Sequence, residues 1–181
     1  ARELKTSKDI KQSHIILGYP TCNILDGDLM PLKVLAGVLS GQSGRLFVEL
    51  RDKQSLAYSV FPLQMFAANS GYFSVYIASE HSKVDKCISG IKTQIEKLKN
   101  DLVAEDEIKR SKNYLVGLKE IELQTSCSQA LNMGIYEFYG KDHKDAFRYS
   151  DLVMGVTAQD LQRVAQKYFL DNKQNLVVLT K

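Results

Sequence analysis

The run from Leu39 to Val60 reads Leu-Ser-Gly-Gln-Ser-Gly-Arg-Leu-Phe-Val-Glu-Leu-Arg-Asp-Lys-Gln-Ser-Leu-Ala-Tyr-Ser-Val. Gly41 ends a helix, and Ser43-Gly44 opens a second, shorter one whose apolar positions follow at helical spacing. A strand begins at Tyr58, where apolar residues replace the polar segment. The run therefore predicts a helix, a tight turn, a short helix and a strand in succession.

On the C-terminal side of this run the sequence predicts a β-hairpin. The strand from Tyr58 to Ala68 is followed by the turn Asn69-Ser70-Gly71 and by a return strand from Tyr72 to Ser79. Pro62 interrupts the first strand and cannot donate a ladder hydrogen bond. We therefore expect an edge position, a bulge or a bend at Pro62.

On the N-terminal side, Ile10 to Tyr19 predicts a strand with apolar residues on both faces. Asp26-Gly-Asp28 predicts a turn and a helix start, since Pro31 fits the first helical turn, where its missing N–H is not needed. The helix carries apolar residues at Leu32, Leu35, Val38 and Leu39.

The remainder of the chain is mostly helical. The expected elements are helices over Ser82–Leu98, Ala104–Leu123, Ser126–Tyr139 and Asp145–Met154, a helix from Thr157, and a final buried strand over Asn175–Thr180. Ser82 and Thr157 each resemble the start of a capping box. Periodicity places Leu118 and Ile121 on the inner face of their helix. Hairpin-joined strands and grouped helices predict an α+β fold with an antiparallel-rich sheet covered on one face by helices.

The composition of the chain limits the classes of function that it can have. The chain has 181 residues, with 24 basic and 21 acidic side chains and a net charge of +3, and it has no basic block, so we expect no nucleic-acid partner. No apolar run approaches the roughly 20 residues that span a bilayer. Three widely separated cysteines favour free thiols and a reducing compartment, the cytoplasm or an organelle matrix. No linker divides residues 1–181, so we expect one domain, and the absence of an initial Met favours a fragment of a longer chain.

The Leu39–Val60 run, with the later Gly71-Tyr-Phe-Ser-Val-Tyr76, strongly resembles the second-domain signature of the pitrilysin and mitochondrial-processing-peptidase family of zinc metallopeptidases. That signature continues from a glycine- and serine-containing turn into Arg-Leu-Phe, an acidic residue, Leu-Arg and Leu-Ala-Tyr-Ser. The resemblance extends from about Lys11 to Leu179. At Gly44 the chain departs from the family, in which many members carry Ser, and this affects only the local turn.

Enzymes of that family pair a zinc-binding domain with a similar zinc-free domain. The zinc domain carries His-x-x-Glu-His on a helix, where two histidines bind one metal and the Glu activates its water. This chain has only His14, His81 and His143, none of them four residues from another. We therefore expect no catalytic residue, no metal site and no cofactor in this chain, and zinc in a partner domain. We interpret His14 as a strand residue and the other two histidines as solvated loop residues.

Arg51 and Tyr58 are the candidate substrate-binding residues, because the resemblance implies that an Arg and a Tyr at these positions reach toward the peptide on the zinc domain. Cationic and hydroxyl donors stabilise the oxyanion of a cleaved peptide bond. In the structural alternative, Arg51 complements a helix dipole and pairs with Asp52 or Glu49, and Tyr58 is ordinary strand packing. The family also implies that the strand Tyr72–Ser79 offers an edge to an extended peptide.

The resemblance implies that this chain is the non-catalytic, substrate-binding half of a zinc endopeptidase and is inactive alone. Its partners would be a catalytic zinc-bearing domain or subunit and a peptide or unfolded polypeptide. One alternative is a structural subunit of the same family, a scaffold similar to the core proteins of a respiratory complex. Another is a free-standing peptide-binding module.

Overall fold

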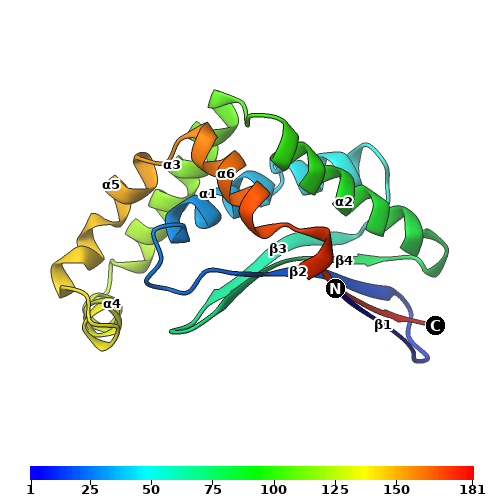
Figure 1. Ribbon diagram of the computed structural model, residues 1–181, viewed down its shortest axis with the longest axis horizontal. Coiled ribbons are helices and arrows are strands. Elements are labelled where there is room, and N and C mark those ends of the chain that lie inside the picture. The colour runs from blue at the N-terminus through cyan, green and yellow to red at the C-terminus, as the bar shows by residue number, and fades with distance from the viewer.

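The computed structural model describes residues 1–181 as one sheet beneath a layer of helices (Figure 1). The strands are β1 (Arg2–Ser7), β2 (Ser13–Thr21), β3 (Ser59–Phe66), β4 (Gly71–Ser79) and β5 (Asn175–Thr180), in the sheet order β1-β5-β2-β4-β3. All neighbours are antiparallel except β1 and β5, which are parallel. The predicted α+β fold with an antiparallel-rich sheet is confirmed.

The helical layer covers one face of the sheet. Its α-helices are α1 (Leu29–Leu39), α2 (Val84–Asn100), α3 (Glu105–Glu122), α4 (Ser126–Phe138), α5 (Tyr149–Met154) and α6 (Ala158–Tyr168). A π-helix, η1 (Phe47–Asp52), and the 3₁₀ segments η2 (His81–Lys83), η3 (His143–Arg148) and η4 (Asp171–Lys173) join them. In Figure 1, α2 lies at one end of this layer and α4 and α5 at the other.

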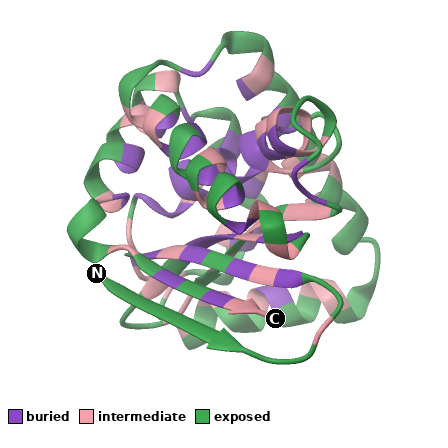
Figure 2. Ribbon diagram, turned by 90° about the vertical axis from the view of Figure 1, so that its right-hand side faces the viewer, coloured by how far each residue is buried: buried purple, intermediate pink, exposed green.

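The hydrophobic core lies between the sheet and the helices, as the buried stretches in Figure 2 show. Alternation along β2 sends Ile15 and Leu17 into it, both fully buried, while Ile16 faces the open side of the sheet. On that open side Ile16 stands in register with Val177 and Tyr76 on the neighbouring strands. The helical layer thus buries one face of the sheet and leaves apolar side chains on the other.

The structure adds one strand to the predicted fold and corrects three predictions. β1 was not predicted; it lies at the sheet edge with all its residues exposed (Figure 2). β4 pairs with both β2 and β3, so Tyr72–Ser79 cannot offer a free edge to a peptide. Ser82 lies within η2 and caps no helix. Leu118 and Ile121 are exposed because the C-terminal half of α3 extends past the core.

Other local predictions hold. Pro62 lies on β3, which is an edge strand, as its missing N–H requires. Thr157 and Asp160 form a complete capping box at the start of α6. Asp28 precedes the first residue of α1, and Pro31 lies buried in the first turn.

Candidate functional site

The candidate site begins with η1, the short helix that carries Arg51. Gly44 allows the chain to turn into it, because a Cβ there would lie 2.2 Å from the Ser40 carbonyl oxygen. Leu46 and Leu50 are fully buried and anchor the inner side of the helix. Gly90 of α2 admits Leu50, since a Cβ at Gly90 would come within 2.6 Å of Leu50 Cδ2. Close packing therefore fixes η1 against α2.

The loop from η1 to β3 is held by backbone hydrogen bonds. The Leu56 N–H donates to the Leu50 carbonyl at 2.8 Å, and the Tyr58 N–H donates to the Ala78 carbonyl of β4 at 3.2 Å. The Ser79 hydroxyl donates to the Leu56 carbonyl. Ser55 adopts a left-handed backbone with φ of 50°, which closes the turn. Arg51 and Tyr58 are therefore held at the two ends of a pinned loop.

Arg51 and Tyr58 lie side by side. The Arg51 guanidinium carbon is 5.5 Å from the centroid of the Tyr58 ring and 4.6 Å from that of the Phe47 ring. Both distances are within the range of cation–π attraction. The Tyr58 side chain is 74% exposed, so its ring flanks the guanidinium on the solvent side. Phe47 lies four residues before Arg51, and this helical spacing is the sequence signal for their contact.

No carboxylate pairs with Arg51. The nearby Glu49 instead forms an ion pair with Lys53, whose Nζ lies 2.6 Å from Glu49 Oε1. The hydrogen bond from Lys53 lowers the pKa of Glu49. The pairing of Arg51 with Asp52 or Glu49, which the structural alternative proposed, is therefore not observed. Arg51 does lie in the last turn of η1, where a cation suits the helix dipole. The two rings position the guanidinium and leave its N–H donors without a protein acceptor.

This arrangement can bind an anionic or carbonyl oxygen. A guanidinium offers five donors in a fixed planar fork, and a phenol adds one hydroxyl donor. The Arg51 guanidinium lies beside the Tyr58 ring, Arg51 is partly exposed and Tyr58 is exposed, and neither side chain makes a hydrogen bond within the chain. The pair offers hydrogen-bond donors suited to an oxygen-rich group and contains no nucleophile.

Arg45 differs from Arg51 in having a carboxylate partner. Its Nε and Nη2 donate to the two oxygens of Glu107 at 3.0 and 2.7 Å. The bidentate hydrogen bonds from Arg45 lower the pKa of Glu107. Arg45 therefore fastens the glycine turn to the first turn of α3.

The three histidines lie apart in different contacts. His14 lies in β2 as predicted, with Nδ1 2.7 Å from the Tyr76 hydroxyl. His81 is not a solvated loop residue: Nδ1 lies 2.8 Å from the buried Ser13 hydroxyl and Nε2 lies 3.1 Å from the Ile10 carbonyl oxygen. These bonds fix the segment between β1 and β2 against η2.

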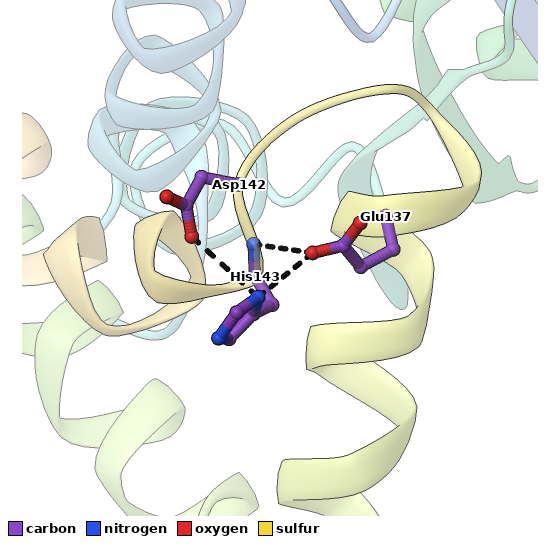
Figure 3. Close-up of side chains that lie close together, drawn as sticks. All are labelled: Glu137, Asp142 and His143. Carbon is purple, nitrogen blue, oxygen red and sulfur yellow. Dashed lines mark hydrogen bonds and ion pairs between the residues drawn. The ribbon is translucent and has the colours of Figure 1, made fainter.

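His143 is exposed, as predicted, and lies beside Glu137 and Asp142 (Figure 3). Its Nδ1 is 2.7 Å from Glu137 Oε1 and 3.6 Å from Asp142 Oδ1. The hydrogen bond from His143 lowers the pKa of Glu137. Asp142 also caps η3 by accepting from the Lys144 N–H at 2.8 Å. All three side chains are exposed and already satisfied by these local contacts, so their proximity alone does not define a metal site.

Comparison with known proteins places the chain in a family. Residues 2–115 match the peptidase M16 inactive domain. An uncharacterized zinc protease of Mycobacterium tuberculosis is 30% identical over 175 residues, which cover 96% of this chain and 40% of that protein. One of Bacillus subtilis is 26% identical over 163 residues, covering 90% and 39%.

Solved structures agree. A protease from Helicobacter pylori superposes with a TM-score of 0.90 at 25% identity, over 99% of this chain and 44% of that one. A peptidase M16 inactive domain from Pseudomonas fluorescens gives a TM-score of 0.89 at 17% identity, over 99% and 43%. The second likeness concerns the fold alone.

The fold and the Leu39–Val60 signature define a peptidase-type domain. The chain belongs to the family of peptidase M16 inactive domains. The resemblance to zinc metallopeptidases that the Leu39–Val60 run indicated is thereby confirmed.

The chain spans about two fifths of the length of the curated relatives it matches, 39% in one case and 42% in another. None of the helices combines the length and the apolar character needed to cross a membrane.

Proposed function

We propose that this domain is the substrate-binding half of a zinc endopeptidase and closes a peptide chamber against a zinc-bearing half that lies outside this chain. Residues 1–181 would then be one domain of a longer polypeptide or one subunit of a pair. The zinc would be bound and used on the other half. Arg51 and Tyr58 would contact the peptide from this half.

The observation that carries the proposal is the Arg51 guanidinium, which makes cation–π contacts with two aromatic rings and has no carboxylate partner. A cation that served only the fold would gain by pairing with an acid, as Arg45 does with Glu107. Arg51 instead keeps its donors free, in the last turn of η1, and backbone hydrogen bonds hold the loop that follows. Preorganised donors of this kind stabilise developing negative charge better than water does, because they do not reorganise during the reaction.

A division of the site between two halves would place the metal ligands on the other half. Peptide cleavage passes through an oxyanion at the carbonyl attacked by zinc-bound water. Donors supplied from the opposite wall reach that oxygen only when the halves close, so closure completes the site. The family assignment and the zinc-protease relatives support this division.

The test is peptide hydrolysis by the full-length protein carrying Arg51→Ala. We expect kcat/KM to fall by about 100-fold, the loss typical when one oxyanion donor is removed. Arg51→Lys keeps the charge but loses the planar fork, so its kcat/KM should lie between those of the parent and of Arg51→Ala. Tyr58→Phe removes the hydroxyl and keeps the ring, and we expect a smaller loss.

Lys53→Ala is the matched control, because Lys53 is an exposed cation two residues away that pairs with Glu49. It should leave kcat/KM unchanged, and the melting temperatures of all four variants should stay close to that of the parent. Full activity of Arg51→Ala would refute the role of Arg51. A full-length protein that binds no zinc and cleaves no peptide would instead favour the scaffold role.

A further inference from the structure

A second concave site lies at the other end of the helical layer from η1. It is a cavity of about 460 Å³ between α1, α4 and α5, with the C-terminal half of α3 on one side. In Figure 1, α4 and α5 lie far from α2, against which η1 packs. This volume is within the range of pockets that hold small molecules.

The walls of the cavity are mostly apolar. Nine of its 15 lining residues are hydrophobic, including Met30, Ile135 and Leu152. Three of these nine are tyrosines, Tyr136, Tyr139 and Tyr149. Burial raises the pKa of Tyr149 and of Tyr136, so both phenols stay neutral at physiological pH. The cavity can therefore accommodate an apolar group.

The charges around the cavity are unbalanced toward positive. Four cations and a single carboxylate line it: Lys33, Lys119, Lys141 and Arg148 against Asp145. Arg148 pairs with Asp145 at 3.0 Å, and Lys119 pairs at 3.1 Å with Glu122, which lies just outside the lining. No carboxylate pairs with Lys33 or Lys141. Two cationic groups thus face the cavity without a counter-ion.

Lys33 is the central cation. It projects from α1, is partly buried, and its Nζ lies 5.3 Å from the centroid of the Tyr149 ring. Lys119 Nζ lies 5.7 Å from the centroid of the same ring, so two ammonium groups contact one tyrosine. Burial and then the positive charges of Lys119 and Lys141 lower the pKa of Lys33, and Glu122 opposes them. An anion bound beside Lys33 would offset the cost of desolvating its ammonium group and reduce the repulsion from the neighbouring cations.

We propose that this cavity binds a carboxylate joined to a small apolar group, with the carboxylate at Lys33 and the apolar group against Met30, Ile135 and Leu152. A carboxylate is favoured over a phosphate because most of the lining is apolar and only two cations lack a partner. Such a ligand could come from the C-terminal residue of a peptide or from a free medium-chain fatty acid. The site does not involve Arg51 or Tyr58.

Octanoate is the first probe, with octanol as the matched ligand that has the same chain length and no carboxylate. We would titrate octanoate into the 181-residue chain and monitor binding by calorimetry and by amide chemical shifts. Octanoate should bind and change the amide chemical shifts of residues in α1 and α5. Octanol should bind at least tenfold more weakly. N-acetyl-leucine against its amide tests the peptide source in the same way, and the tighter of the two acids identifies the source.

Lys33→Met removes the charge and keeps most of the side-chain length, and it should weaken octanoate binding at least tenfold. Lys141→Met should weaken it less, and serves as a second variant if Lys33→Met folds poorly. Lys86→Met, an exposed lysine on α2, is the control and should change nothing. Equal binding of octanoate and octanol, no binding of either acid, or full affinity in Lys33→Met would overturn the proposal. Arg51→Ala should leave octanoate binding intact, so this test is independent of the proposed peptidase role.

Discussion

Asp28 should be the most stabilising carboxylate in this domain. It precedes α1 and is 5% exposed, yet its side chain does not cap that helix. It turns toward α6 and accepts from Arg163 Nη1 at 2.6 Å, from Lys167 Nζ at 2.6 Å and from the Tyr168 hydroxyl at 2.8 Å. One carboxylate therefore fastens the start of α1 to the last two turns of α6.

The pKa of Asp28 gives the size of this effect. Burial alone would raise the pKa, but the hydrogen bonds from Lys167, Arg163 and Tyr168 outweigh it and lower the pKa from 3.8 to about 2. Because the folded pKa lies below the unfolded one, this stabilisation is complete above the unfolded pKa and is lost as the pH falls through the folded value. The difference corresponds to about 2 kcal/mol at neutral pH. About half of it should be gone by pH 3.

Asp28→Asn should therefore lower the free energy of unfolding at pH 7 by about 2 kcal/mol. The cost should not reach the roughly 3–5 kcal/mol of a fully buried broken pair, because Arg163 and Lys167 are half exposed and stay hydrated. In a domain of this size the melting temperature should fall by roughly 4–8 °C. Urea unfolding followed by circular dichroism at pH 7, 4 and 3 measures the difference between parent and variant.

The difference in unfolding free energy between the parent and the Asp28→Asn variant must shrink toward low pH if the reasoning is right. Asp101→Asn is the control, since Asp101 is exposed and makes no side-chain hydrogen bond, and it should change stability by less than about 0.5 kcal/mol at any pH. A loss for Asp28→Asn that is the same at pH 7 and pH 3 would refute the assignment to the ionised carboxylate.

Two further predictions concern the glycine turn before η1 and the cap of α6. Gly44→Ala should destabilise the domain by roughly 1–3 kcal/mol, because its Cβ would meet the Ser40 carbonyl oxygen at 2.2 Å. Gly27→Ala is the control, since a Cβ at Gly27 meets nothing within 4 Å. Equal melting temperatures for the two variants would contradict this packing. Thr157→Ala should cost about 1 kcal/mol by removing the cap of α6. It should also raise the pKa of Asp160, which the Thr157 hydrogen bond now lowers, and an NMR titration showing no rise would exclude the capping box in solution.

Much of the fold could be predicted because its elements carry local signals. The alternation of β2, the hairpin turn before β4 and the periodicity of α2 each follow from neighbouring residues. β1 could not be predicted, since Arg2–Ser7 shows no alternation and is exposed on both faces. Its strand conformation depends on parallel pairing with β5 at the other end of the chain, where Arg2 stands in register with Asn175.

The same distinction applies to the two candidate sites. Arg51 and Tyr58 lie seven residues apart in one motif, so sequence reasoning could single them out, and the structure brings them together. The cavity near Lys33 is built from α1, α3, α4 and α5, and no spacing within one element links Lys33 to Lys119 or Tyr149. Likewise, the period of α3 predicts Leu118 and Ile121 to be inward, but periodicity does not show where the core ends.

The interaction partners of the basic side chains differ between those that stabilise the fold and those that we infer bind ligands. Four basic side chains lie over aromatic rings: Lys33, Arg51, Lys119 and Lys167. Lys119 and Lys167 also have carboxylate partners, which are Glu122 within the same helix for Lys119 and Asp28 at the start of α1 for Lys167. Arg51 and Lys33 have only the rings, which attract a cation without occupying its hydrogen-bond donors. An aromatic ring is thus a way to position a cation while keeping its donors free, and in this chain both such cations lie at the sites where we infer that oxygen-bearing ligands bind.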